Sequence, residues 1–288
     1  MSGRHIVHRY EFDAPCVHGF GDFCRGVLSF LVLQPYCNYQ YNIHFKDHPF
    51  SKCFREEGLI LPADTQFDGY ATKFMSKGIT ARDFDDLEYD QLKREFVEPT
   101  EYKYLVYSNS WLFPQDILAA QAHRLQRVFV PTDYFRSHID EVEKRFGSKD
   151  QDFLVLHYRM GDPYHFKPKA DPSKAPFGDD VRTGTRVTIT EAVARVEAAA
   201  AMLPNPNNLP IMLITDNPAI NPECHRLGLI TFDDFPIAHT HSKQDVPIDH
   251  YLNSMAQFFI MGKAKGIKQM AVSGFSFWCA QIFEVRIL

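Results

Sequence analysis

Short apolar runs alternate with longer segments of helical periodicity along most of the chain. The runs expected to form strands are residues 5–11, 38–45, 102–107, 153–157, 211–215, 229–232 and 269–273. The segments expected to form helices are residues 22–33, 114–124, 132–146, 188–203, 248–259 and 275–285. Residues 163–185 are rich in Pro, Lys and Asp and are expected to form a loop. Strands that alternate with helices predict parallel sheets with helices on their faces.

The clearest amphipathic helix, residues 132–146, precedes the best candidate for a domain boundary. Its apolar face consists of Phe135, Ile139, Val142 and Phe146. The polar stretch 148–152 follows it, and domain boundaries fall in such stretches. We therefore expect an amino-terminal domain of residues 1–148 and a carboxyl-terminal domain of residues 149–288, both α/β, with a cleft between them.

Composition excludes several classes of protein. The 288 residues are 45% hydrophobic and 23% charged, with a formal net charge of −5, which argues against disorder and against a generally basic nucleic-acid binder. No apolar run is long enough to span a membrane, and the first ten residues lack the apolar stretch of a signal peptide. The six cysteines form no C-x-x-C pair. Reduced, buried thiols in a cytoplasmic protein are therefore expected.

The most informative segment, HYRMGD (residues 157–162), lies at the carboxyl end of the expected strand 153–157. Ligands of open α/β sheets bind at the carboxyl ends of the strands, where Arg159 would lie. A guanidinium group there can bind a phosphate through two parallel hydrogen bonds. The alternative is an ion pair between Arg159 and Asp162 that only fixes the loop.

Three further segments stand at junctions between a strand and a helix. The loop 19–22 has the sequence GFGD, residues 214–216 read ITD, and residues 273–276 read SGFS. The amino-terminal end of a helix, as expected at Ser273, favours a diphosphate. Each segment also has a purely structural interpretation, because Asp and Ser commonly cap helices and turns without any ligand.

Taken together, the four segments resemble the fucosyltransferase superfamily. HYRMGD is similar to its H-x-R-x-G-D motif, and the other three follow its G-x-G-N, T-D and S-x-F-S segments in the same order. The resemblance implies the GT-B fold, with two Rossmann-like domains whose parallel sheets face a central cleft. It also implies an inverting glycosyltransferase that needs no metal and moves a sugar, first of all from GDP-fucose, to a glycan hydroxyl.

The resemblance assigns roles to particular residues. The donor-binding residues are expected to be Gly19, Gly21, His157, Arg159, Asp162, Asp216, Ser273, Phe275 and Ser276. Arg159 would stabilise the leaving diphosphate. Asp22 replaces the family's asparagine and can act as a general base, with His18 as a second candidate base. Lys46 and His48 are expected on the acceptor side.

Three other functions remain open. A GT-B transferase that uses a UDP-sugar such as UDP-xylose has the same motifs. A metal-dependent GT-A transferase would bind its metal through a D-x-D motif, for which Asp83 to Asp85 and the pair Asp233 and Asp234 are candidates. A protein that binds a sugar or nucleotide without catalysis is the third. A dinucleotide-binding dehydrogenase and a P-loop kinase are excluded, because neither glycine fingerprint occurs.

Overall fold

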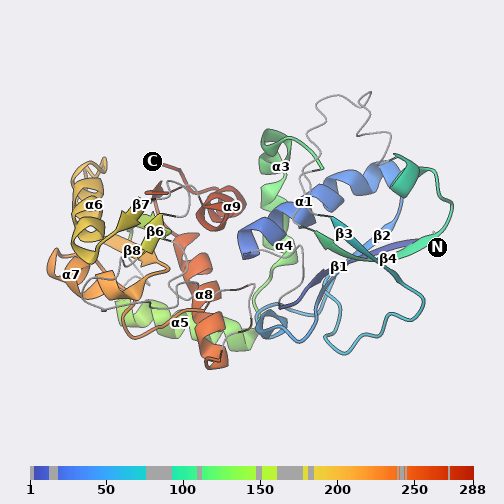
Figure 1. Cartoon of the computed structure of the whole chain (residues 1–288), viewed down its shortest axis with the longest axis horizontal. Coiled ribbons are helices and arrows are strands. Elements are labelled where there is room, and N and C mark those ends of the chain that lie inside the picture. The colour runs from blue at the N-terminus through green and yellow to red at the C-terminus, as the bar shows by residue number, and fades with distance from the viewer. Residues whose placement is uncertain are drawn as a thin grey trace.

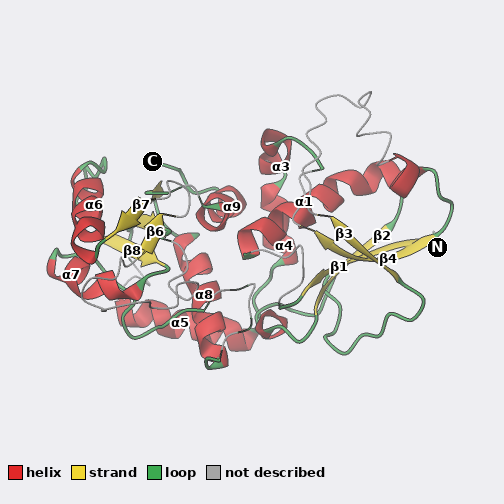
Figure 2. Ribbon diagram, viewed as in Figure 1, coloured by secondary structure: helices red, strands yellow, loops and turns green. Residues whose placement is uncertain are grey.

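The computed structural model describes residues 3–12, 19–75, 93–108, 112–146, 151–160, 178–180, 185–238, 240, 243, 245–271 and 273–288. Within these ranges, two separate parallel sheets lie toward opposite ends of the long axis, with helices between and around them (Figures 1 and 2). The mixed α/β class with parallel sheets, expected from the sequence, is confirmed.

The first sheet has the strand order β2-β1-β4-β3. Its strands are β1 (Arg4–Tyr10), β2 (Gln40–Phe45), β3 (Ala71–Met75) and β4 (Tyr102–Ser108). Helix α1 (Phe20–Cys37) covers one face, where the rings of His8 and Tyr10 lie 4.6 and 4.7 Å from that of Phe23. The strict alternation of side chains along β1 puts His5 and Arg9 on the opposite face.

The second sheet has the order β8-β5-β9. Its strands are β5 (Leu154–Tyr158), β8 (Ile211–Thr215) and β9 (Gly266–Gln269). All five residues of the central strand β5 are buried, as is typical of a parallel strand covered on both faces. Helix α6 (Ile189–Ala201) packs on one side, and it begins with the capping box of Thr188 and Glu191 that the sequence predicts.

The remaining elements connect and cover the two sheets. They are α3 (Gln115–Ala120), α4 (Leu125–Val128), α5 (Asp133–Phe146), α7 (Asn221–Arg226), α8 (Ile248–Met261), α9 (Gly274–Phe283), the 3-10 turns Pro49–Lys52, Ala122–Arg124 and Pro218–Ile220, and the π turn Lys93–Val97. A short antiparallel ribbon pairs β6 (Gly178–Asp180) with β7 (Thr185–Val187). Among the described residues, no helix combines the length and the apolar character that crossing a membrane demands.

The larger hydrophobic core extends across both sheets. It includes Ile6 and Val106 of the first sheet together with Val155 and Ile267 of the second. The last helix, α9, packs against α1, and α5 packs against α8 (Figure 1). Segments far apart in the sequence therefore share one core.

Helix α1 extends past Pro35, although the sequence predicts that it stops there. A proline lacks the N–H that would bond to the carbonyl four residues earlier, which in this helix is that of Leu31. Arg124 donates a hydrogen bond to that carbonyl at 3.2 Å. The helix then ends at Asn38, whose left-handed conformation (φ 48°) caps it.

The helix expected over residues 114–124 is divided into α3 and the 3-10 turn Ala122–Arg124. Three strand or loop predictions also differ in the structure. Residues 229–232 make only an isolated bridge between Met212 and Ile230, and the strand expected at 269–273 lies earlier, at Gly266–Gln269. The expected loop 163–185 contains the short strand β6 and meets β7. Backbone pairing with a neighbouring strand decided each of these bounds, and apolar character alone does not specify it.

Candidate functional site

The residues singled out in the sequence converge where β5 and β8 end and α9 begins. Arg159 follows β5, Asp216 follows β8, and Ser273 immediately precedes α9. The start of α1 lies against the start of α9, which adds Gly21 and Asp22 to the same place. The site is thus assembled from both halves of the chain.

Asp216 holds the loop after β5 in position. Its Oδ2 accepts a hydrogen bond from Arg159 Nε at 2.7 Å, and its Oδ1 accepts one from the Met160 backbone N–H at 2.7 Å. The side chain of Asp216 is 10% exposed, whereas that of Arg159 is 40% exposed. The carboxylate therefore anchors the base of the guanidinium group, which still reaches solvent and presents a positive charge there.

His157 is buried beside Arg159. Burial, together with the Arg159 charge, lowers the pKa of His157 to about 3, so the imidazole is neutral at pH 7. Its Nδ1 is buried and has no hydrogen-bond partner among the described residues. Its ring lies 6.1 Å from that of Phe275. An unpaired buried nitrogen is costly, so this atom marks a place where a ligand or water would be stabilised.

Both serines at the start of α9 are buried. Ser273 occupies the cap position without a side-chain capping bond, and the Ser276 hydroxyl accepts a hydrogen bond from the Gln269 amide at 2.8 Å. Both side chains are less than 4% exposed. The groups that α9 can offer to a ligand are therefore the N–H groups of its first turn.

The amino-terminal ends of α1 and α9 touch through glycine. A Cβ atom built on Gly21 would lie 2.3 Å from the carbonyl carbon of Gly274, so only glycine permits this approach. A Cβ atom on Gly274 would lie 3.4 Å from Asp22 Oδ1, which places this carboxylate beside the start of α9. Just before α1, a Cβ atom on Gly19 would make only an ordinary contact with the Thr240 hydroxyl, at 3.9 Å. That hydroxyl accepts the Phe20 N–H at 3.1 Å.

Arg25 is a site residue that the sequence analysis missed. Its guanidinium group lies 3.2 Å from Asp22 Oδ1, and its side chain is only 15% exposed. Burial lowers the pKa of Arg25, while the Asp22 charge opposes this effect. The spacing of three residues on one helix was the available signal, but nothing in the sequence marked Arg25 as buried.

Lys46 and His48 follow the end of β2. Lys46 is half exposed and lies 3.9 Å from Glu11. His48 is buried, donates from Nε2 to the Thr240 carbonyl at 2.8 Å and accepts the Phe50 N–H at Nδ1. Its burial lowers its pKa to about 3. His48 thus links β2 to the carboxyl-terminal half as a neutral ring.

Two expected site residues, His18 and Asp162, lie outside the described residues, as does the D-x-D candidate at 83–85. Of the other acidic pair, Asp233 accepts a hydrogen bond from the Thr231 hydroxyl and Asp234 pairs with Arg145. Over the described ranges, no three His, Cys, Asp or Glu side chains come together as a metal site requires. Independence from metal stays a prediction.

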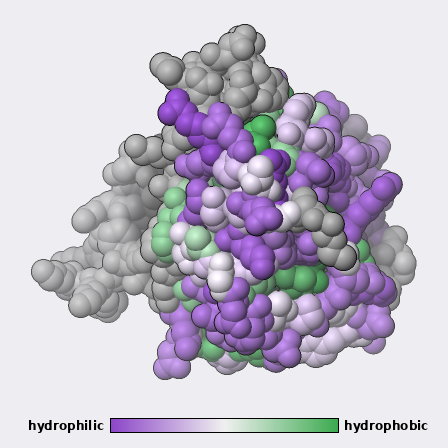
Figure 3. All heavy atoms as spheres, turned by 90° about the vertical axis from the view of Figure 1, so that its right-hand side faces the viewer, coloured by the Kyte–Doolittle hydropathy of each residue, from purple (hydrophilic) through white to green (hydrophobic). Residues whose placement is uncertain are grey.

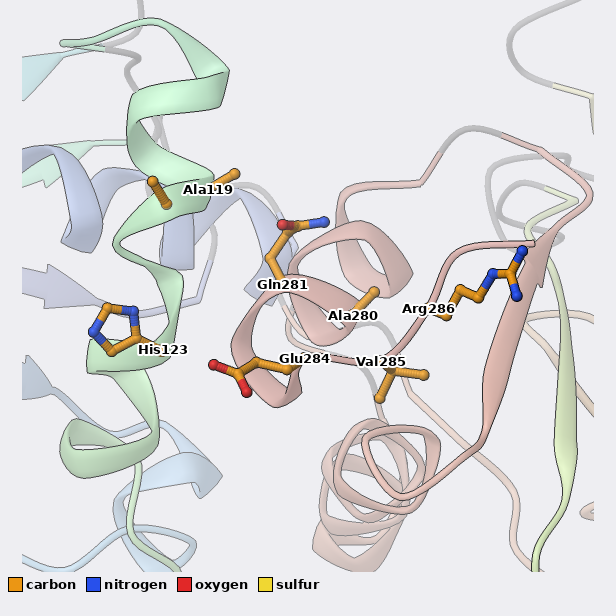
Figure 4. A pocket seen from close by; sticks show the side chains of 8 residues that line it. Ala119, His123, Ala280, Gln281, Glu284, Val285 and Arg286 are labelled. Atoms are coloured by element: carbon orange, nitrogen blue, oxygen red, sulfur yellow. The ribbon is translucent and has the colours of Figure 1, made fainter.

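A pocket of about 360 Å³ lies at the opposite end of α9 (Figure 4). His123 from the turn after α3 and Glu284 from the end of α9 face each other across it. The remaining lining residues are Ala119, Ala120, Ala280, Gln281, Val285 and Arg286. None of the residues singled out in the sequence lines this pocket, so it is separate from the site around Arg159.

Solved structures of fucosyltransferases have the same arrangement of elements. NodZ from Bradyrhizobium matches with a TM-score of 0.53 and 12% identity over 96% of this chain and 92% of that one. A structure of NodZ α-1,6-fucosyltransferase soaked with GDP-fucose has a TM-score of 0.55 and 13% identity, over 97% of this chain and 92% of that one. The apo form of POFUT1 has a TM-score of 0.55 and 11% identity, over 100% of this chain and 98% of that one. A mutant of Arabidopsis thaliana FUT1 in complex with GDP has a TM-score of 0.57 and 11% identity, over 99% of this chain and 69% of that one.

The likeness lies in structure and not in overall sequence. No profile of a known protein family matches the chain. No curated protein matches it either. The expectation of a fucosyltransferase-like, GT-B type of fold, drawn from four short motifs, is confirmed by the structural matches. The chain has the fucosyltransferase fold.

Proposed function

We propose that the chain is a glycosyltransferase that moves a sugar from a nucleotide-sugar donor to a hydroxyl group of a glycan, with GDP-fucose as the first candidate donor. One observation carries the proposal: Arg159, anchored by Asp216, lies with the first turn of α9 and with Asp22 in a fold shared with fucosyltransferases. NodZ with GDP-fucose and FUT1 with GDP provide the reason to test GDP-linked donors first.

In this proposal the carboxyl-terminal residues 149–288 hold the donor and residues 1–148 face the acceptor. Arg159 and the N–H groups at the start of α9 stabilise the negative charge that builds on the leaving diphosphate. The unpaired Nδ1 of His157 and the ring of Phe275 contact the nucleotide. Gly19 and Gly21 let the backbone approach the donor sugar, and the resemblance to the family adds Asp162 as a donor-binding residue and His18 as a second candidate base.

The proposed chemistry inverts the configuration of the sugar carbon. Asp22 takes a proton from the acceptor hydroxyl, the new glycosidic bond forms at the sugar carbon, and the bond from this carbon to the diphosphate oxygen breaks. The positive charge at the site comes from Arg159 and the helix end, so the reaction proceeds without a metal.

Thermal unfolding with added nucleotides tests the donor. GDP, GDP-fucose, UDP and UDP-xylose are compared, each with EDTA and with Mn²⁺. A ligand at a hundred times its Kd stabilises the folded state by about 2.7 kcal/mol. We expect a rise in Tm with GDP in EDTA. A rise with UDP alone moves the donor to a UDP-sugar, a rise that needs Mn²⁺ favours the metal-dependent alternative, and no rise contradicts the proposal.

Substitution of Arg159 tests its proposed role at the diphosphate. Arg159→Ala is expected to slow the release of GDP from GDP-fucose by about 10²–10³-fold, the usual effect of removing one such donor. The matched control is Arg226→Ala, which removes an exposed arginine on α7. Wild-type turnover by Arg159→Ala would remove Arg159 from the mechanism.

Substitution of Asp22 tests the base. Asp22→Asn keeps the shape of the side chain and restores the residue typical of the resembled family, but it cannot take a proton. We expect transfer to fall by about 10²-fold or more while the Tm rise with GDP is kept. An unchanged rate with a glycan acceptor would assign the base to another residue.

A further inference from the structure

The face of the first sheet that points away from α1 carries a continuous row of four side chains. Arg9 pairs in register with His44 of β2, and Tyr107 of β4 pairs with Phe74 of β3. Arg9 Nη1 donates to the Tyr107 hydroxyl at 3.3 Å, which joins the two pairs. The order across the sheet is therefore His44, Arg9, Tyr107 and Phe74.

Three buried polar atoms along this row lack a hydrogen-bond partner among the described residues. They are His44 Nδ1, Arg9 Nε and Glu11 Oε2. His44 donates from Nε2 to the Ala63 carbonyl, and burial lowers its pKa, so its Nδ1 is a free acceptor. Arg9 Nε–H is an unpaired donor. Glu11 Oε2 accepts no hydrogen bond from the described residues, although it lies 3.9 Å from both Arg9 Nη1 and Lys46 Nζ.

Unpaired buried polar groups are rare in folded proteins, and each calls for a partner. Here an acceptor, a donor and a second acceptor lie close together. Arg9 is 12% and Glu11 26% exposed, and the half-exposed Lys46 lies 3.9 Å from Glu11 at the outer edge. The partly exposed side chains of Glu11 and Lys46 form the solvent edge of this group.

Aromatic rings lie on both sides of these atoms. The ring of Phe74 is 54% exposed and stacks on Tyr107, with centroids 5.2 Å apart. The Phe67 ring lies beneath the Arg9 guanidinium, with its centroid 5.2 Å away. The same ring lies 5.0 Å from the His44 ring. An exposed, rigid ring beside hydrogen-bonding groups offers an apolar face and a polar edge to the same ligand.

We infer that this row is a carbohydrate-binding platform for the acceptor glycan, an inference that rests on the proposed function. Sugar hydroxyls both donate and accept, so they suit the mixed set of Arg9, Glu11 and His44. The C–H face of a pyranose ring packs on Phe74. Two carboxylates, Glu11 and Asp47, offset the positive charges of Arg9 and Lys46 around His44, which favours a neutral sugar over an anionic one.

The platform lies on the side of the molecule where an acceptor is needed. Strand β1 runs from the amino terminus at the right of Figure 1 toward the middle, so its last residues are near the helices that join the two sheets. The end of the molecule formed by the first sheet is mainly hydrophilic, with small hydrophobic areas between the polar ones (Figure 3).

An array of immobilised neutral oligosaccharides tests the platform. The full chain, Phe74→Ala, Glu11→Gln and the control Tyr134→Ala are applied at equal concentrations. Tyr134 on α5 is 57% exposed, close to the value for Phe74, and lies outside the row. We expect the wild type and Tyr134→Ala to bind the same glycans, and Phe74→Ala and Glu11→Gln to bind them about tenfold more weakly, or about 1.4 kcal/mol.

Two outcomes would overturn the platform. In the first, the wild type binds no glycan on the array. In the second, both row variants bind as the wild type does, which would mean that ordered water alone pairs the three atoms. The Tm rise with GDP is measured on the same samples. A Tm rise with GDP but no glycan binding supports the proposed function and contradicts the platform. Glycan binding without a Tm rise contradicts the proposed function and supports a glycan-binding role for the row.

Discussion

Asp22 sits among positive charges from three directions. Arg25 lies 3.2 Å from its Oδ1, and the carboxylate is in the first turn of α1 and beside the first turn of α9. The ion pair with Arg25 occupies Oδ1 of this carboxylate. If Asp22 is the base, an incoming acceptor has to loosen that pair.

Buried histidines make the stability of the protein dependent on pH. His8 and His48 are both buried, and burial lowers the pKa of each to about 3, from an ordinary value of 6.5. Between about pH 3 and pH 6.5, these two histidines therefore bind more protons in the unfolded chain than in the folded one. Stability therefore falls as pH decreases from 6.5 toward 3, by up to about 1.4 kcal/mol per pH unit for each histidine.

Urea denaturation at pH 7.5 and pH 5.5 measures this dependence. His48→Gln keeps a donor and an acceptor but cannot titrate, so it is expected to lose less stability between the two pH values than the wild type does. His123→Gln, on an exposed residue, is the control and should lose as much as the wild type. Equal losses in all three proteins would show that His48 does not titrate on unfolding.

At the level of single residues, the sequence identified the site residues that directly follow a predicted strand. Arg159 and Asp216 follow short apolar strands, and the structure pairs them. Arg25, Arg9 and His44 could not be found this way, because their burial results from contacts with distant segments. Arg9, for example, meets Tyr107 from a strand nearly a hundred residues away.

The contact between α1 and α9 depends on the absence of a side chain at one position. Gly21→Ala would put a methyl group 2.3 Å from the backbone of Gly274. We expect a loss of about 1–3 kcal/mol in unfolding free energy, the usual cost of overpacking, because two backbones have to separate. Gly19→Ser is the control, since a Cβ atom there meets nothing closer than Thr240 Oγ1 at 3.9 Å.

Urea titration followed by circular dichroism gives both free energies. The result that contradicts the contact is a Gly21→Ala variant as stable as the wild type. Such a result would mean that the two helices do not touch in solution.

Among the elements, the sequence predicted best those whose pattern is local. The alternation of β1 and the capping box of α6 are such patterns, and both elements formed where expected. The continuation of α1 past Pro35 depends on Arg124, which donates to the carbonyl that the proline leaves unpaired. That bond joins residues 93 positions apart, and no local pattern encodes it.

On the scale of the whole molecule, Thr240 ties the two halves together. Its carbonyl accepts hydrogen bonds from the Tyr10 hydroxyl at 2.9 Å and from His48 Nε2 at 2.8 Å, and its hydroxyl accepts the Phe20 N–H. All three donors come from the first quarter of the chain. With the larger core also continuous across both sheets, the halves are bound by packing and by hydrogen bonds.

This coupling predicts a single unfolding transition in calorimetry, although two sheets are present. Tyr10→Phe removes one of the hydrogen bonds and should lower stability by about 0.5–1.5 kcal/mol without splitting the transition. Tyr36→Phe, at an exposed position, should leave the transition unchanged. Two resolved transitions in the wild type would indicate that residues 1–148 and 149–288 unfold independently.

The pairing of α1 with α9 also sets an order for folding during synthesis. Gly21 is made before its partner Gly274, which follows about 250 residues later. At about 5–20 residues per second, the nascent chain spends roughly 13–50 s with the surface of α1 uncovered. All four strands of the first sheet are made before α9, so α1 gains its partner helix after the sheet is complete in sequence. A chaperone that binds nascent apolar surfaces would have access to α1 during this time.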